Sequence, residues 1–296
     1  MNAFRFSFRR LPCTPHRSMV IAANKVTLTM PHNEMSHELA TAIRVARAAG
    51  DVVMPLFRRG VVASAKRGES RDLVTEADFA ADARIRAELR AAFPDHAIFS
   101  EESAAAGDGV DAATPTWIID PIDGTSNFSR GLPLFSISIA RFHEGQGKVG
   151  VVYAPSLAWL FSAEAGRGAW LNGERLRVSG VDTMERAMLA VDWPRQPLLR
   201  QRSARIVAAF GEEVHTVRTV GSAALALAMV AAGWLDIYWH LILQPWDVAA
   251  AALLIQEAGG HLSTPSGDPW QPAQSAVLAS NGTLHRDAIA MINTVL

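Results

Sequence analysis

Hydrophobic residues recur every three or four positions in a segment that begins just after residue 35. They fall on one stripe of a helix: Leu39, Ile43, Ala46, Val53 and Phe57. Ser36 is a suitable N-cap for this helix, and Gly60 lies just past its end. A second helix is predicted from Glu76 to Phe93, where Pro94 and Asp95 end it. The pattern therefore predicts two helices before the first long strand.

From residue 97 the pattern changes to short runs of residues that favour strands. Strands are predicted over 97–100, 116–119, 135–142, 148–153, 160–163 and 168–171. Asn172-Gly173 predicts a two-residue hairpin turn between 169–171 and 175–178. After about Asp182, predicted helices (201–210, 222–232 and 247–258) alternate with extended segments (213–219 and 236–239). This order predicts an α+β half over 36–182 and an α/β half over 183–296, forming one compact catalytic unit.

The first 33 residues are basic and carry no acidic side chain, with Arg5, Arg9, Arg10, Arg17 and Lys25 as their charges. Such a leader is compatible with an organelle transit segment, but its apolar stretch is too short for a secretory signal. A disordered tail is the other interpretation, as is a start codon assigned too far upstream, with Met19, Met30 or Met35 as the true start. We therefore treat residues 1–35 as a disordered or mis-assigned extension outside the fold.

Composition narrows the class of protein. The chain has 296 residues, 49% of them hydrophobic, and a formal net charge of -1, so it can form a sizeable core and has no electrostatic preference for nucleic acid. Its single cysteine, Cys13, excludes an internal disulfide and a cysteine zinc site. The longest apolar run, 223–235, is shorter than the roughly 20 residues of a membrane span. We expect a soluble, cytoplasmic protein without a membrane or nucleic-acid partner.

Acidic residues stand where apolar strands are predicted to end. Residues 117–119 lead directly into Asp120 and Asp123, and 97–100 lead into Glu101. Pro121 fixes its own φ angle and Gly124 permits a tight turn, so both aspartates can point out of the strand end. If Thr125 opens a helical turn, backbone N–H groups there could face a phosphate. Farther along, Asp247 opens an apolar helix.

Each acidic group also has an ordinary explanation. The aspartates could sit in turns, Asp247 could be an N-cap, and Glu101-Glu102 could lie in a solvated loop. Asp72 and Asp78 could be surface charges. Several carboxylates gathered in one place, however, are costly unless a cation neutralises them. Oxygen ligands without cysteine or histidine favour Mg²⁺, Mn²⁺ or Ca²⁺, so the sequence predicts a site for one of these ions.

These motifs resemble the signatures of the inositol monophosphatase family. The segments that carry the resemblance are 72–78, Glu101-Glu102-Ser103, 120–128, 166–173, 221–224 and 246–250, in matching order over residues 37–296. The resemblance implies a layered αβαβα sandwich of the sugar-phosphatase type, a homodimer, and Mg²⁺-dependent hydrolysis of a small phosphomonoester with two or three metal ions. Direct attack by a metal-activated water, without a phosphoenzyme, is the implied mechanism.

The resemblance also assigns roles to individual residues. The first ion is assigned to Glu101, Asp120 and the carbonyl of Ile122; the second to Asp120, Asp123 and Asp247; and a third, through water, to Asp78. The catalytic set is Glu101, Thr125 and Asp123, with Glu101 and the Thr125 hydroxyl accepting or relaying the proton of the attacking water. The substrate-binding set is Gly124, Thr125, Gly221, Ser222, Ala223, His240 and Lys66.

Two positions depart from the family pattern. His240 stands seven residues before Asp247, where a glutamate usually receives substrate hydroxyls, and Gln244 replaces a histidine. An imidazole offers one donor and one acceptor, which weakens the case for myo-inositol 1-phosphate and histidinol phosphate and leaves nucleotide 3′-phosphates or sugar phosphates open. Alternatively, His240 only packs beside Trp239. Lys66 matches a mobile-loop lysine of the family, or lies in a solvated surface loop.

Other functions stay open on the same motifs. Histidinol-phosphate phosphatase, 3′-phosphoadenosine 5′-phosphate phosphatase and fructose-1,6-bisphosphatase share the metal motifs of this fold. Some bacterial relatives also bind transcription or RNA-processing machinery, so catalysis could be secondary to a binding role. The retained carboxylates favour an enzyme.

Overall fold

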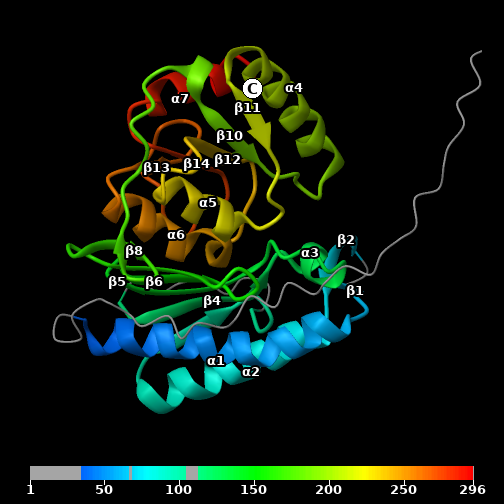
Figure 1. Ribbon diagram of the computed structural model, residues 1–296, viewed down its shortest axis with the longest axis vertical. Helices are drawn as coiled ribbons and strands as arrows, with labels where there is room; N and C mark the ends of the chain where they lie inside the picture. Colours follow the sequence, from blue (N-terminus) through cyan, green and yellow to red (C-terminus); the bar gives the residue numbers. More distant parts are fainter. Residues whose placement is uncertain (1–34, 67–68, 105–112, 296) are drawn as a thin grey trace, which may run out of the picture.

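The computed structural model in Figure 1 describes residues 35–66, 69–104 and 113–295; the prediction for the N-terminal extension falls almost wholly outside them. Helix α1 (His37–Arg59) begins where predicted, because the Ser36 hydroxyl accepts the N–H of Leu39 at 3.1 Å. Helix α2 (Glu76–Ala92) begins with a capping box between Thr75 and Asp78. Leu39, Ile43, Ala46 and Val53 of the predicted stripe are buried and Phe57 is partly buried, which confirms the periodicity argument for α1.

The larger sheet has seven strands in the order β3-β4-β5-β6-β7-β8-β9. Their bounds are β3 Ala97–Ser100, β4 Thr116–Asp123, β5 Ser136–His143, β6 Gln146–Ala154, β7 Trp159–Glu164, β8 Gly168–Leu171 and β9 Glu174–Arg175. Only β3 and β4 are parallel to each other, and every other neighbouring pair is antiparallel. All eight residues of β4 are buried, so the strand that delivers Asp120 and Asp123 runs through the interior.

The smaller sheet has five strands in the order β11-β10-β12-β14-β13. Their bounds are β10 Met188–Val191, β11 Thr216–Arg218, β12 Ile237–His240, β13 His261–Ser263 and β14 Val277–Ser280. Strand β10 is parallel to both β11 and β12, whereas β14 is antiparallel to β12 and β13. The residues that follow the parallel strands β10 and β12 therefore lie at the same end of this sheet.

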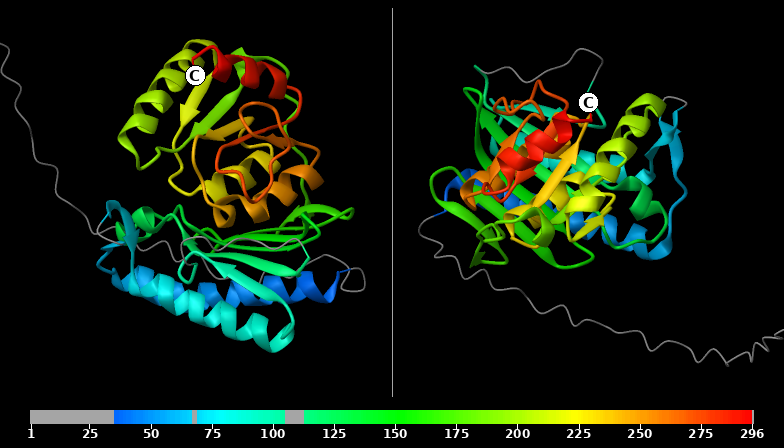
Figure 2. Two further views of the ribbon diagram at one scale, coloured as in Figure 1. Left: turned by 180° about the vertical axis from the view of Figure 1, so that it is seen from behind. Right: turned by 90° about the horizontal axis from the view of Figure 1, so that it is seen from above.

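Helices and sheets stack in five layers (Figure 1). Helices α1 and α2 cover the outer face of the large sheet, and α5 (Ala223–Ala231) and α6 (Pro245–Glu257) fill the space between the two sheets. Helices α4 (Pro197–Glu213) and α7 (His285–Asn293) cover the outer face of the small sheet, as the view from behind in Figure 2 also shows. This confirms the predicted layered αβαβα fold.

Several elements were not predicted. Strands β10, β13 and β14 and helix α7 have no counterpart among the predicted elements, although α4 and β11 lie where a helix and an extended segment were expected. A short hairpin of β1 (Ser64–Lys66) and β2 (Glu69–Val74) replaces the expected polar loop. A 3₁₀ turn over Met184–Arg186 was also not predicted, whereas the one-turn helix α3 (Thr125–Ser129) is the helical turn considered for Thr125. Among the described residues, no helix combines the length and hydropathy needed to cross a bilayer. The proposed halves, 36–182 and 183–296, stay a prediction.

Candidate active site

Asp120 and Asp123 leave the sheet through an irregularity at the end of β4. The pairing of β4 with β5 shifts register between these two residues, so Pro121 and Ile122 stand out of the ladder. The N–H of Ile122 turns back and donates to Oδ1 of Asp120 at 3.0 Å. Because of this turn, both carboxylates point to the same side, as the sequence predicted.

Asp247 reaches the same place from helix α6. The Ser138 hydroxyl, opposite Asp120 in the ladder, donates to the carbonyl of Trp246 at 3.0 Å and ties the start of α6 to β5. Gln244, not Asp247, is the N-cap of the helix, and its N–H donates to Oδ2 of Asp247 at 2.8 Å. One carboxylate oxygen each of Asp120, Asp123 and Asp247 lie within 4.8 Å of one another. The three aspartates of the predicted second metal site therefore converge.

Proximity and burial make this cluster of carboxylates hard to ionise. Burial, together with the nearby negative charges of Glu101 and the other aspartates, raises the pKa of Asp120 and of Asp247 well above its usual range. Burial raises the pKa of Asp123 to about 7, although hydrogen bonds from the Ser222 hydroxyl (2.5 Å) and the Ala224 N–H (2.7 Å) partly oppose the shift. Such a set is suited to a divalent cation with oxygen ligands, which would replace the protons and balance the charge.

Glu101 follows β3 beside this cluster, and its carboxylate contacts Lys66 of the β1–β2 hairpin. The ammonium of Lys66 lies 3.0 Å from Glu101 and 2.8 Å from Glu102. Burial opposes the charge on Lys66, but the two carboxylates raise its pKa overall; burial also raises the pKa of Glu102 to about 7. The Lys66 side chain is only 17% exposed, so the alternative of a solvated surface loop is wrong for this residue.

Thr125 lies between Asp78 and the backbone of β4. Its hydroxyl is 3.2 Å from both Oδ1 of Asp78 and the carbonyl of Ile122. Asp78 is buried, and its other oxygen accepts the Thr75 N–H and hydroxyl at 2.8 and 2.6 Å. Burial raises the pKa of Asp78 above its usual value. Asp78 is therefore not the surface charge that one interpretation suggested; it is linked through Thr125 to the end of β4.

The loop before α5 packs against Gly124 and the start of α3. Gly124 has φ 98°, and a Cβ there would lie 3.0 Å from the carbonyl of Gly221. The Asn127 amide donates to the carbonyls of Leu134 (2.6 Å) and Val220 (2.9 Å). Since Ser222 also holds Asp123, the start of α3 and the loop before α5 form one hydrogen-bonded unit. Gly221 and Ala223 line the same pocket, so the structure places the predicted phosphate-binding segments together.

His240, the last residue of β12, also lines the pocket and is 5% exposed. Its Nδ1 accepts the N–H of Ile242 at 3.1 Å, and burial lowers its pKa to about 4. The ring is therefore neutral near pH 7 with its proton on Nε2. Of the one acceptor and one donor expected of an imidazole, the acceptor is used by the Ile242 N–H and the donor is left for the pocket. The preceding residue, Trp239, belongs to the core cluster that includes α4 and α7, whereas His240 lines the pocket.

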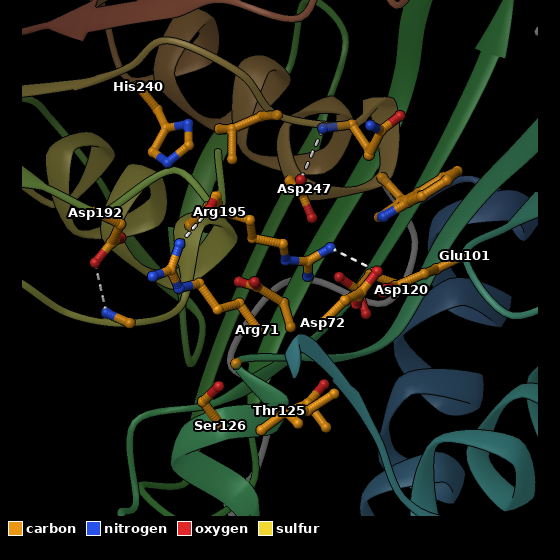
Figure 3. A pocket seen from close by; sticks show the side chains of 18 of the residues that line it. Arg71, Asp72, Glu101, Asp120, Thr125, Ser126, Asp192, Arg195, His240 and Asp247 are labelled. Atoms are coloured by element: carbon orange, nitrogen blue, oxygen red, sulfur yellow. Dashed lines mark hydrogen bonds and ion pairs between the residues drawn. The ribbon is translucent and has the colours of Figure 1, made fainter. Parts of the chain in front are cut away.

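The sequence argument missed the opposite wall of this pocket, whose volume is about 630 Å³. Arg71, Asp192, Trp193 and Arg195 line it. Figure 3 shows Arg195 extending into the pocket below Asp247, where it pairs with Asp72 at 2.9 Å; Arg71 donates to the Arg195 carbonyl at 2.9 Å. A signal was present, because the apolar run 187–191 ends in Asp192, as 117–119 end in Asp120.

Comparison with known proteins gives a consistent result. The sequence profile described as the inositol monophosphatase family matches residues 34–295. The chain is 40% identical over 250 residues to a protein of Pseudomonas aeruginosa named Nus factor SuhB, covering 83% of this chain and 92% of that protein. It is 36% identical over 259 residues to a Thermotoga maritima protein named fructose-1,6-bisphosphatase/inositol-1-monophosphatase, covering 86% of this chain and 95% of that one.

A solved structure of an IMPase from Thermotoga maritima superimposes with a TM-score of 0.80 and 35% identity, covering 88% of this chain and 98% of that one.

Proposed function

The chain belongs to the inositol monophosphatase family, and we propose that it is a Mg²⁺-dependent phosphatase that hydrolyses a small phosphomonoester at the carboxylate cluster. The observation that carries this proposal is the convergence of Asp120, Asp123 and Asp247 from two separate elements. These carboxylates form no ion pair with a basic side chain among the described residues, and a cation site explains why like charges are gathered there. Family membership supports a small phosphorylated substrate and Mg²⁺ as the metal.

The donor set supports the roles assigned from the family pattern. Glu101, Asp120 and the Ile122 carbonyl would hold one ion; Asp120, Asp123 and Asp247 would hold a second; and Asp78 would act through water on a third. When bound, these ions would lower the pKa of a water molecule and neutralise charge on the phosphate. Every donor in the set is an oxygen, as Mg²⁺ prefers.

The residues of the chain would supply positioning and proton transfer. The Thr125 hydroxyl lies within hydrogen-bond distance of Asp78 and of the Ile122 carbonyl, so it can relay a proton between the pocket and Asp78. Glu101 would accept the proton of the attacking water. The backbone N–H groups of Gly124 and Thr125, at the start of α3, would bind the phosphate oxygens, and Gly221, Ser222 and Ala223 would close the site around them.

Phosphate release from a panel of substrates tests the proposal. The panel contains myo-inositol 1-phosphate, histidinol phosphate, fructose 1,6-bisphosphate, 3′-phosphoadenosine 5′-phosphate and glycerol 2-phosphate, each with and without Mg²⁺. Asp123→Asn should abolish Mg²⁺-dependent release. Asp182→Asn is the matched control, because Asp182 forms an exposed pair with Arg186. Absence of Mg²⁺-dependent release from every substrate would contradict the proposal.

The stereochemical course tests direct water attack. With a substrate whose phosphorus is made chiral by oxygen isotopes, a single displacement inverts the configuration at phosphorus. A phosphoenzyme would require two displacements and would give retention. We expect inversion, and retention would exclude direct attack.

A regulatory role is the second candidate, favoured by the relatives named Nus factor SuhB at 40% identity. Because these relatives are named as Nus factors, the prediction that the protein has no nucleic-acid partner is not supported. A pulldown with the Asp123→Asn variant separates the two candidates, because a binding role would survive loss of catalysis. Assembly as a homodimer and location in the cytoplasm are consistent with the family and are part of this proposal.

A further inference from the structure

We propose that Arg71, Arg195 and His240 form a subsite for a second acidic group of the substrate. The preferred substrates would then be phosphomonoesters that also carry a carboxylate or a second phosphate. This inference rests on the proposed phosphatase function and names the substrate class of the same site. It concerns the wall of the pocket that faces the carboxylate cluster.

His240 gives this wall a donor where a polyol-binding site would have an acceptor. Within the described part of the chain, the only hydrogen bond of its ring is the one that Nδ1 accepts from Ile242. The remaining ring nitrogen, Nε2, therefore carries a proton and can donate to an acidic oxygen. An ammonium group on a ligand would find no acceptor at this ring.

Arg195 brings a positive charge next to this donor. Its backbone precedes α4, and its side chain extends into the pocket between Asp247 and Thr125 (Figure 3). The guanidinium gives one nitrogen to Asp72, and the Arg195 side chain is 55% exposed. A guanidinium has five N–H donors in a planar fork, so the pairing with Asp72 leaves donors for a carboxylate or a phosphate.

Arg71 adds a second charge that no acidic side chain among the described residues balances. Its one hydrogen bond in that part of the chain goes to the Arg195 carbonyl. It thereby holds the segment that carries Arg195, and Arg71 itself is an exposed residue that lines the pocket. Arg71 and Arg195 therefore lie close together, because the Arg71 side chain is hydrogen-bonded to the backbone of Arg195.

The acidic residues of the same wall offer a ligand little. Asp72 pairs with Arg195 through Oδ2, and its Oδ1 is buried, without a hydrogen-bond partner among the described residues. Asp192 accepts the Gly221 N–H at 2.8 Å and lies 3.4 Å from the Tyr238 hydroxyl. Because Asp72 Oδ1 is shielded from solvent and Asp192 is hydrogen-bonded, the charged side chains of this wall that remain open to a ligand are the two exposed arginines, Arg71 and Arg195. Such a wall attracts an anion and repels a cation.

Matched ligand pairs test this subsite, and binding can be measured without turnover. Glycerol 2-phosphate and 2-phosphoglycerate differ by one carboxylate, and adenosine 3′-monophosphate and adenosine 3′,5′-bisphosphate differ by one phosphate. Dissociation constants would be measured by calorimetry on the full chain, with Ca²⁺ in place of Mg²⁺ so that little ligand is consumed. We expect the acidic member of at least one pair to bind about tenfold more tightly, as a charged hydrogen bond would give.

Variants assign that preference to the arginines. Arg195→Gln and Arg71→Gln should each reduce the ratio of the two dissociation constants within a pair, and Arg195→Lys should retain part of it. Arg202→Gln is the control, because Arg202 is an exposed residue of α4 outside the pocket. Equal binding of both members of each pair, or a ratio unchanged in Arg195→Gln and Arg71→Gln, would overturn the inference.

Different results would reject the phosphatase function and the subsite. Mg²⁺-dependent phosphate release without a preference for the acidic ligands would reject the subsite and keep the phosphatase. Failure to bind any of the four ligands, together with no release from any substrate, would reject the phosphatase and the subsite with it.

Discussion

The ammonium of Lys66 lies 3.0 Å from the carboxylate of Glu101, a residue that the family pattern assigns to a metal ion. The same ammonium contacts Glu102 at 2.8 Å, and both ion pairs are largely shielded from solvent. The side chain of Lys66 therefore binds the carboxylate that a cation would need. A metal ion bound by Glu101 would share this carboxylate with the ammonium, whose positive charge opposes a second cation there.

Lys66→Met should therefore increase the affinity for Mg²⁺. Removing the ammonium frees Glu101 and adds net negative charge beside Asp120. We expect the dissociation constant for Mg²⁺ to fall about fivefold, since partly exposed ion pairs contribute up to ~1 kcal/mol. Calorimetric titration with Mg²⁺ measures this directly. Lys148→Met, at a lysine of β6 outside the pocket, is the control; an unchanged or weaker affinity in Lys66→Met would show that the two cations do not compete.

Stabilisation by Mg²⁺ should grow with pH. The pKa of Asp123 is raised from about 4 in the unfolded chain to about 7 in the folded protein. Without metal, the stability that its bound proton contributes is therefore full below about pH 4 and lost as the pH rises through 7. Mg²⁺ binds the ionised carboxylates, so it should raise the melting temperature more at pH 8 than at pH 6.

Thermal unfolding at both pH values, with and without Mg²⁺, gives this comparison. Asp123→Asn removes a titrating group and a ligand together, so its Mg²⁺-dependent shift should be small at either pH. If Mg²⁺ raised the melting temperature of the wild-type protein equally at pH 6 and pH 8, it would bind away from the carboxylates whose pKa is raised.

His240→Glu should change the order of substrates. A glutamate would replace the Nε2 donor by an acceptor, which favours hydroxyl and ammonium groups over acidic ones. We expect kcat/KM for myo-inositol 1-phosphate and histidinol phosphate to rise relative to 2-phosphoglycerate, with the same requirement for Mg²⁺. His215→Glu, at an exposed histidine, controls for added charge. The same order of substrates in wild type and His240→Glu would show that His240 does not select.

Gly124→Ala should cost more stability than Gly131→Ala. Both glycines have a positive φ, 98° and 74°, so both substitutions place an alanine in a left-handed conformation at about 1–2 kcal/mol. Only at Gly124 would the new Cβ also meet backbone, at 3.0 Å from Gly221 O and 3.2 Å from Leu134 O. Urea unfolding measures the difference, and equal losses would contradict a close approach of these loops.

The motifs and their order in the sequence predicted most of the fold and identified the carboxylates of the site. Apolar runs that end in acids identified Asp120, Asp123 and Glu101 before any geometry was available, and helical periodicity placed α1 and α2 nearly residue by residue. These signals are local, because strand ends and amphipathic stripes are written in consecutive residues. The strands β10, β13 and β14 are three or four residues long, too short to show a period.

The second wall of the pocket could not be predicted in the same way. Arg71 and Arg195 are 124 residues apart and meet only because the β1–β2 hairpin reaches the segment before α4. The donor character of His240 likewise depends on the turn that brings the Ile242 N–H to Nδ1. Such properties come from tertiary contacts, and a single sequence does not show them.

We propose above that the cluster of Asp120, Asp123 and Asp247 holds the metal ions of a phosphatase. Crystals grown with Mn²⁺, under conditions where Mn²⁺ supports phosphate release, test it through the anomalous scattering of the metal. We predict at least one strong anomalous peak in contact with Asp120 and Asp123, with metal–oxygen distances of about 2 Å. Anomalous peaks only at other sites, or none at these aspartates in an active protein, would contradict the account.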